Sequence, residues 1–136
     1  MKLEDEVCSL DLAKKLKELG VKQESLFQHV NNPIGHAGWQ MWFQGRVATV
    51  LGERAEWYAA FTVAELGEIL PPTIDGKYND KTRWFNSRKT SKACVWYENA
   101  RPNEEIMTEA DTEADARAKM LVYLIENQLV GVKSFG

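Results

Sequence analysis

The sequence lacks the features that would place the chain in a membrane or direct it to secretion. Among its 136 residues, no apolar run approaches the roughly 18 residues needed to span a bilayer. Its first residues, MKLEDEVCSL, are acidic where a signal peptide needs a positive region followed by an apolar core. We therefore expect a cytoplasmic protein that makes no membrane contact.

Cysteine and histidine are scarce, with two of each in the chain. Cys8 and Cys94 lie far apart in sequence, so we expect two free thiols in a reducing compartment and no disulfide. Structural zinc sites usually draw their ligands from closely spaced pairs. Neither the two cysteines nor His29 and His36 form such a pair. We predict that the protein has no metal site and no cofactor.

Motifs that carry catalysis are also missing. The chain contains no glycine-rich phosphate loop, no nucleophile elbow and no His-Glu-x-x-His pattern. Cys94 stands in an apolar strand segment, where burial raises the pKa of a thiol and makes it inert. We expect no enzymatic activity, and a small enzyme with a site of unrecognised kind remains an alternative. A net charge of −3 argues against a molecule built as a whole to bind polyanions.

Helix signals are present in three places. Apolar residues recur at helical spacing over residues 10–19, after Ser9, which suits the capping position. The stretch from Thr62 to Glu65 is a capping box that opens a second helix over residues 63–70, and the following prolines end it. The third helix lies near the end of the sequence and follows an acidic segment.

That acidic segment repeats the tetrapeptide Thr-Glu-Ala-Asp over residues 108–115. Its alternating carboxylates imitate the start of a calcium-binding loop, but alanine and valine stand where that loop needs glycine and glutamate. Thr112 instead suits a helix cap, with Asp115 in the capping-box position and acidic residues near the positive end of the helix dipole. We predict that the segment starts a helix, and that the apolar residues within 120–129 pack beneath a β layer.

Strand signals alternate with these helices. Aromatic and β-branched residues predict one hairpin within residues 25–43 and a second one from residues 82–88 and 93–99. Two further short strands are predicted at residues 47–51 and 56–60. The order is helix, hairpin, helix, hairpin, helix, which indicates an α+β fold in which an antiparallel sheet of about four strands packs with three helices. Residues 1–136 form a single domain.

Aromatic and basic residues supply the candidate binding sites. Residues 77–92 contain six basic residues and one acid, and Trp84 and Phe85 lie among them, a combination that binds single-stranded nucleic acid by backbone attraction and base stacking. Residues 104–126 carry seven acids and two bases, so the two segments could instead neutralise each other or join copies of the chain. The five tryptophans favour packing in or at the edge of the core over a binding platform. The candidate binding residues are Lys81, Arg83, Trp84, Phe85, Arg88, Lys89, Trp39 and Trp42.

Three blocks of the sequence resemble a group of short proteins common in phages and prophage-bearing bacteria. They are VCSLDLAKKLKELGVKQESLF, FTVAELGEILPP and ADTEADARAKMLVYLIENQL, which occur in that group in the same order with tryptophan-containing strands between them. The blocks cover less than half of the chain but include its three predicted helices. No activity is established for the group. The resemblance therefore implies a mobile-element context, an accessory role and a cytoplasmic location, and it assigns no site residue.

These observations favour a non-enzymatic protein-interaction module. We expect it to bind a protein partner, or a second copy of itself, through an aromatic and charged sheet surface. Weak, sequence-tolerant binding of single-stranded nucleic acid by residues 77–92 is the less favoured alternative.

Overall fold

The computed structural model describes residues 3–31, 38–43, 56–71, 73–74, 83–89, 92–98 and 106–129. Its helices are α1 (Leu3–Glu6), α2 (Leu10–Glu18), α4 (Val63–Ile69) and α5 (Glu113–Glu126). Its strands are β1 (Phe27–Asn31), β2 (Trp39–Phe43), β3 (Glu56–Ala59), β4 (Thr73–Ile74), β5 (Arg83–Lys89), β6 (Ala93–Glu98) and β7 (Ile106–Ala110). No helix of this described part is long and apolar enough to cross a membrane.

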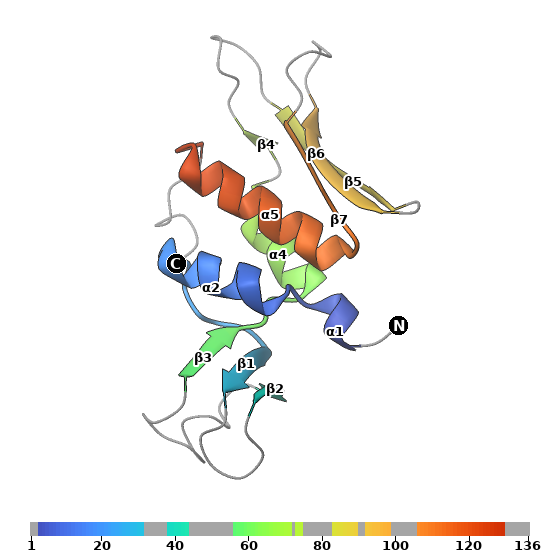
Figure 1. Ribbon diagram of the computed structural model, residues 1–136. Coiled ribbons are helices and arrows are strands. Elements are labelled where there is room, and N and C mark those ends of the chain that lie inside the picture. Colours follow the sequence, from blue (N-terminus) through green and yellow to red (C-terminus); the bar gives the residue numbers. More distant parts are fainter. Residues whose placement is uncertain are drawn as a thin grey trace.

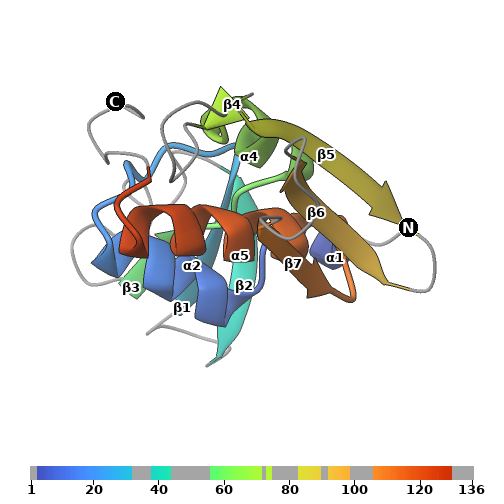
Figure 2. The ribbon, with the colours of Figure 1, turned by 90° about the horizontal axis from the view of Figure 1, so that it is seen from above.

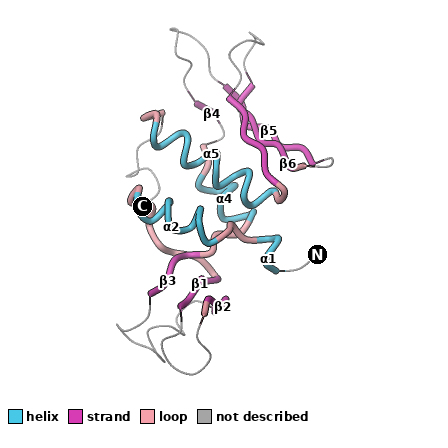
Figure 3. The backbone as a smooth tube through the Cα atoms, viewed as in Figure 1, coloured by secondary structure: helices cyan, strands magenta, loops and turns pink. Residues whose placement is uncertain are grey.

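The helices form a layer between two antiparallel sheets, which lie at opposite ends of the molecule (Figures 1 and 3). One sheet has the strand order β2-β1-β3, and the other has the order β4-β5-β6-β7. The predicted α+β class is confirmed. The predicted hairpins are both present, but each belongs to its own sheet and each sheet has gained further strands.

Helix α5 organises the core. It packs against β6 and β7 on one side and against α2 and α4 on the other, and Figure 2 shows it running beside α2. Met120, Leu121 and Leu124 are fully buried, as expected for the apolar part of this helix. The small residues Ala114, Ala116 and Ala118 are buried as well, and these allow the helix to approach its neighbours closely. The prediction that the last helix packs beneath a β layer is therefore confirmed.

The acidic repeat starts a helix, but its last carboxylate serves a different helix. The hydroxyl of Thr112 accepts a hydrogen bond from the backbone N–H of Asp115 at 3.2 Å, as a helix cap should. The Asp115 carboxylate accepts a hydrogen bond from the backbone N–H of Ser9 at 2.6 Å. Ser9 occupies the capping position of α2, yet its own side chain makes no capping hydrogen bond. Asp115 thus joins the beginnings of α2 and α5.

The structure contains two strands that were not predicted from the sequence, β4 and β7. Strand β7 was not predicted, because its sequence, Ile-Met-Thr-Glu-Ala, runs into the acidic repeat and has few strong strand formers. It forms because pairing with β6 lets Ile106, Thr108 and Ala110 face the core at every second position. The predicted strand at residues 56–60 is confirmed as β3, which pairs with β1. The one at residues 47–51 lies outside the described residues.

Candidate functional site

The central strand β1 determines where the backbone groups of its neighbours point. The carbonyl of Phe27 accepts a hydrogen bond from the N–H of Ala60 at 2.9 Å, so the backbone groups of Phe27 face the β3 side. Backbone groups alternate between the two sides of an antiparallel strand. Gln28 and Val30 therefore direct their backbone groups toward β2.

On β2, the residues opposite these two are Trp42 and Gln40, which use their backbone groups in the ladder with β1. The alternate residues direct their N–H and C=O groups away from the sheet, and they are Trp39, Met41 and Phe43. In the described part of the chain, no strand or loop pairs with these outward groups. We call Trp39, Met41 and Phe43 the β2 edge.

The opposite edge of the same sheet is closed by side chains. The N–H of Ala59 donates to Oε1 of Gln23 at 2.8 Å, and Nζ of Lys17 donates to the carbonyl of Trp57 at 3.3 Å. On the edge strand of the other sheet, β7, Nζ of Lys119 donates to the carbonyl of Glu109 at 3.0 Å. Side chains thus bind backbone groups along β3 and β7, whereas the outward backbone groups of the β2 edge have no partner among the described residues.

The composition of β2 also suits pairing with another strand. Its sequence, Trp-Gln-Met-Trp-Phe, contains no charge and no proline, the residues that commonly protect edge strands from association. The side chain of Phe43 is 63% exposed and that of Trp39 is 38% exposed. Phe43 also contacts Phe27, with ring centroids 5.1 Å apart. The β2 edge therefore combines an apolar row on one face of the strand with backbone groups that no other described residue binds.

Two lysines of α2 hold this face of the sheet against the helix layer. Nζ of Lys14 lies 5.1 Å from the ring centroid of Trp39 and 5.9 Å from that of Tyr58. Nζ of Lys17 lies 5.0 Å from the Tyr58 ring and 5.3 Å from the Trp57 ring. Each such cation–π contact contributes about 0.5–1 kcal/mol at an exposed site. Lys14 therefore helps to fix the Trp39 end of β2, whereas both ring contacts of Lys17 are with β3.

The two tryptophan candidates lie on opposite faces of β2. Trp39 belongs to the face held by the lysines, whereas Trp42 packs with Trp57 against the fully buried Val30. On this second face, Gln28 is buried, and its Oε1 has no hydrogen-bond partner among the described residues. Only Trp39 of the pair is therefore part of the exposed row.

The basic hairpin does not gather its candidate residues on one face. Lys81 lies outside the described residues, and the other candidates are on β5, namely Arg83, Trp84, Phe85, Arg88 and Lys89. The register pairs Phe85 with Tyr97 and Lys89 with Ala93, and it pairs Trp84 with Glu98 and Arg88 with Cys94. Consecutive candidates therefore alternate along the strand, and each set of alternate positions contains both a basic and an aromatic residue.

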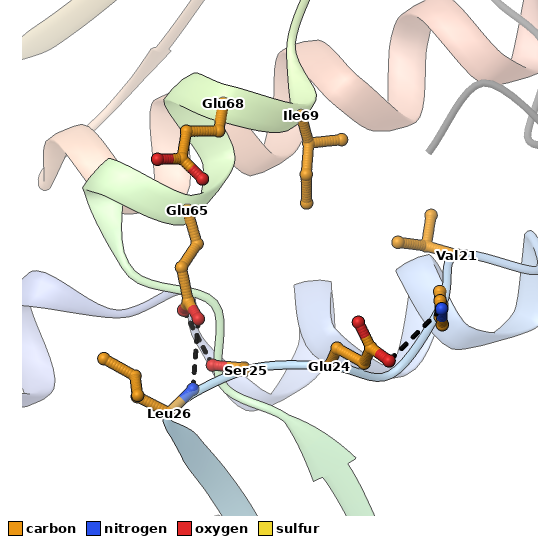
Figure 4. A pocket seen from close by; sticks show the side chains of 8 residues that line it. Val21, Glu24, Ser25, Leu26, Glu65, Glu68 and Ile69 are labelled. Carbon is orange, nitrogen blue, oxygen red and sulfur yellow. Dashed lines mark hydrogen bonds and ion pairs between the residues drawn. The ribbon is translucent and has the colours of Figure 1, made fainter. Parts of the chain in front are cut away.

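A pocket of about 310 Å³ separates α4 from the segment that leads into β1 (Figure 4). Glu65 accounts for most of its polar contacts, because its carboxylate accepts hydrogen bonds from Ser25 Oγ at 2.7 Å, Thr62 N–H at 2.9 Å and Leu26 N–H at 3.0 Å. Glu24 on the pocket wall forms an ion pair with Lys22 at 3.2 Å. Glu65 therefore serves to join α4 to β1, with both of its carboxylate oxygens in hydrogen bonds.

The thiols and His29 are held by structural contacts. Cys8 is fully buried, and desolvation raises the pKa of its thiol to about 12. Nε2 of His29 lies 2.8 Å from the carbonyl of Cys8, and Sγ of Cys94 donates to Oε2 of Glu109 at 3.5 Å. Within the described ranges, no three His, Cys, Asp or Glu residues are grouped so that they could hold a metal ion. His36 lies outside those ranges.

The raised pKa of Cys8 predicts a pH dependence of stability. The ordinary pKa of 9.0 applies to the unfolded chain, so the unfolded thiol ionises above that pH while the folded thiol stays neutral up to about pH 12. The stability that this difference contributes is present below pH 9 and is lost as the pH rises. We expect the free energy of unfolding to fall by about 1 kcal/mol between pH 8 and pH 10 through this group alone. Urea unfolding at the two pH values should show this loss in the wild-type chain and a smaller loss in Cys8→Ala; equal losses would contradict the assignment.

The described residues thus bring together a lysine-anchored aromatic face and the available β2 edge. The carboxylates of Glu65 and Asp115 accept hydrogen bonds that join separate elements of the fold. Comparison of the chain with protein-family models, with curated proteins and with solved structures finds no match.

Proposed function

We propose that this chain is a non-enzymatic protein-interaction module that receives an extended segment of another polypeptide along the β2 edge. The observation that supports the proposal most directly is the contrast between the strands at the sheet edges. Side chains bind backbone groups of β3 and β7, while the outward backbone groups of Trp39, Met41 and Phe43 have no partner in the part of the chain that the structure describes. In strand addition, backbone hydrogen bonds supply affinity and alternate side chains supply specificity.

The resemblance to short phage and prophage proteins supports an accessory role in a mobile element, acting in the cytoplasm on a protein of the phage or its host. Nucleic-acid binding by residues 77–92 has weaker support, because the chain as a whole carries a net charge of −3.

The proposal is tested with an extended peptide selected from a random-sequence library for binding to the chain. On addition of this peptide to ¹⁵N-labelled protein, the amides of Trp39, Met41 and Phe43 should become protected from hydrogen exchange. Met41→Pro removes an N–H that points away from the sheet and leaves the β1–β2 ladder intact, since proline is tolerated at such edge positions. We expect this variant to bind the peptide about fivefold to tenfold more weakly, as the loss of one backbone hydrogen bond implies.

Two further variants sharpen the test. Phe43→Lys places a charge on the exposed row and should also weaken binding. Leu26→Lys changes a side chain that is 59% exposed but lies outside the β2 edge, so it should bind as the wild type does. Protection of amides elsewhere, with affinity unchanged in Met41→Pro and Phe43→Lys, would refute strand addition at β2.

A further inference from the structure

The outward backbone groups of β2 form a set that is symmetric about its middle residue. Met41 is the centre, and Trp39 and Phe43 lie two residues away on either side. If a second β2 strand approaches in the antiparallel direction, a two-fold axis at Met41 sets Met41 opposite its own copy and Trp39 opposite Phe43 of the other chain. The two residues of each such pair face each other with their outward backbone groups, so they exchange both N–H···O=C hydrogen bonds. Every outward N–H and C=O of β2 thereby acquires a partner.

The side chains of β2 are compatible with this self-pairing. Because the strand has no charged residue, the pairing brings no like charges into opposition within the two strands. The exposed Phe43 of one chain meets the exposed Trp39 of the other, and aromatic cross-strand pairs of this kind stabilise antiparallel sheets. Lys14 lies over Trp39, and the two Trp39 residues are at opposite ends of the paired β2 strands. The two Lys14 side chains therefore lie at opposite ends as well. With Trp39 residues about 13 Å apart along the strands, the two ammonium groups are separated by more than the Debye length of about 8 Å.

We propose that a second copy of this chain occupies the β2 edge, as an antiparallel pair of β2 strands centred on Met41. This inference rests on the proposed function of the edge and names its partner. The pairing joins the two β2-β1-β3 sheets into one continuous antiparallel sheet, in which the two β2 strands are the central neighbours. The same surface is used on both chains, as two-fold symmetry requires.

Cysteine cross-linking in a Cys94→Ser background tests both the pairing and its register. The two Cα atoms of a hydrogen-bonded antiparallel pair lie about 5.5 Å apart, within the disulfide range of about 4.4–6.8 Å. Met41→Cys should therefore form a disulfide-linked dimer on mild oxidation. Trp39→Cys and Phe43→Cys should cross-link when they are mixed, whereas each alone should not, because identical residues at these positions are about 13 Å apart. Leu26→Cys, exposed but off the edge, is the matched control and should stay monomeric.

Sedimentation of the unmodified chain supplies an independent readout. We expect a reversible dimer that dissociates on dilution and that is lost in Met41→Pro. A wild-type chain that stays monomeric, together with no cross-linking of Met41→Cys, would overturn self-pairing. Cross-linking of Trp39→Cys alone would also overturn it, because that result requires another register.

This inference and the proposed function can fail separately. If the chain is monomeric but the selected peptide still protects Trp39, Met41 and Phe43 and loses affinity for Met41→Pro, then strand addition at the edge holds and a different polypeptide is its partner. If neither dimer nor peptide protection is found, both are rejected.

Discussion

Replacing Leu124 with alanine is expected to lower the free energy of unfolding by about 2–5 kcal/mol. Leu124 is fully buried on α5, next to Leu121 and Met120, at the point where this helix packs between the larger sheet and the other helices. Truncation removes apolar contacts and leaves a cavity that surrounding residues from several elements can fill only in part. A loss of this size is a large fraction of the 5–15 kcal/mol that stabilises an ordinary domain.

Urea unfolding followed by circular dichroism measures this loss. The matched control is Glu126→Ala, on the same helix but with an exposed side chain, which should change the free energy of unfolding by less than about 0.5 kcal/mol. Losses of similar size in Leu124→Ala and Glu126→Ala would show that α5 does not organise the core.

Replacing Glu65 with alanine is expected to lower the free energy of unfolding by about 2–4 kcal/mol, from the loss of a helix cap and of hydrogen bonds to a charged acceptor. The substitution leaves the N–H groups of Thr62 and Leu26 without the carboxylate that accepts from them. It also removes the closer of the two acceptors of the buried Ser25 hydroxyl, which keeps the carbonyl of Ala60 at 3.0 Å. Because these contacts join α4 to β1, amide exchange should rise at Leu26 and along β1.

Glu68→Ala is the control for this prediction. Glu68 lies on the same helix and lines the same pocket, but its carboxylate has no hydrogen-bond partner in the described part of the chain. Its replacement should change the free energy of unfolding by less than about 0.5 kcal/mol. Thermal unfolding of the two variants beside the wild type separates the outcomes. Equal shifts would mean that the Glu65 hydrogen bonds do not stabilise the fold.

Features that depend on neighbouring residues were predictable. The capping box at Thr62 and Glu65 has both of its hydrogen bonds in the structure, and Thr112 caps the last helix. These signals are reliable because the donor, the acceptor and the turn that joins them lie within a few residues of one another. The predicted α+β class followed from the alternation of such signals.

Features that depend on partners distant in sequence were not predictable. Nothing in the sequence indicates that Asp115 receives the Ser9 N–H, a contact between residues that are 106 positions apart. The β5 candidates look like one cluster in the sequence, but an extended strand sends successive residues to opposite faces. The β2 edge was not predicted, because the sequence does not show which strand lies at the edge of a sheet. Nor does it show that side chains of Gln23 and Lys17 bind the outward backbone groups of β3.

The amino-acid sequence by itself determined where α2, α4 and α5 begin, which residues of α5 are apolar enough to be buried, and that β2 carries no charge. Only the tertiary structure decided that the strands separate into two sheets and that β2 lies at an edge with its outward groups available. The physical reason is the range of the interactions involved. Caps and periodic apolar patterns arise within a few residues, whereas strand order and edge protection depend on hydrogen bonds between segments that meet only after the chain has folded.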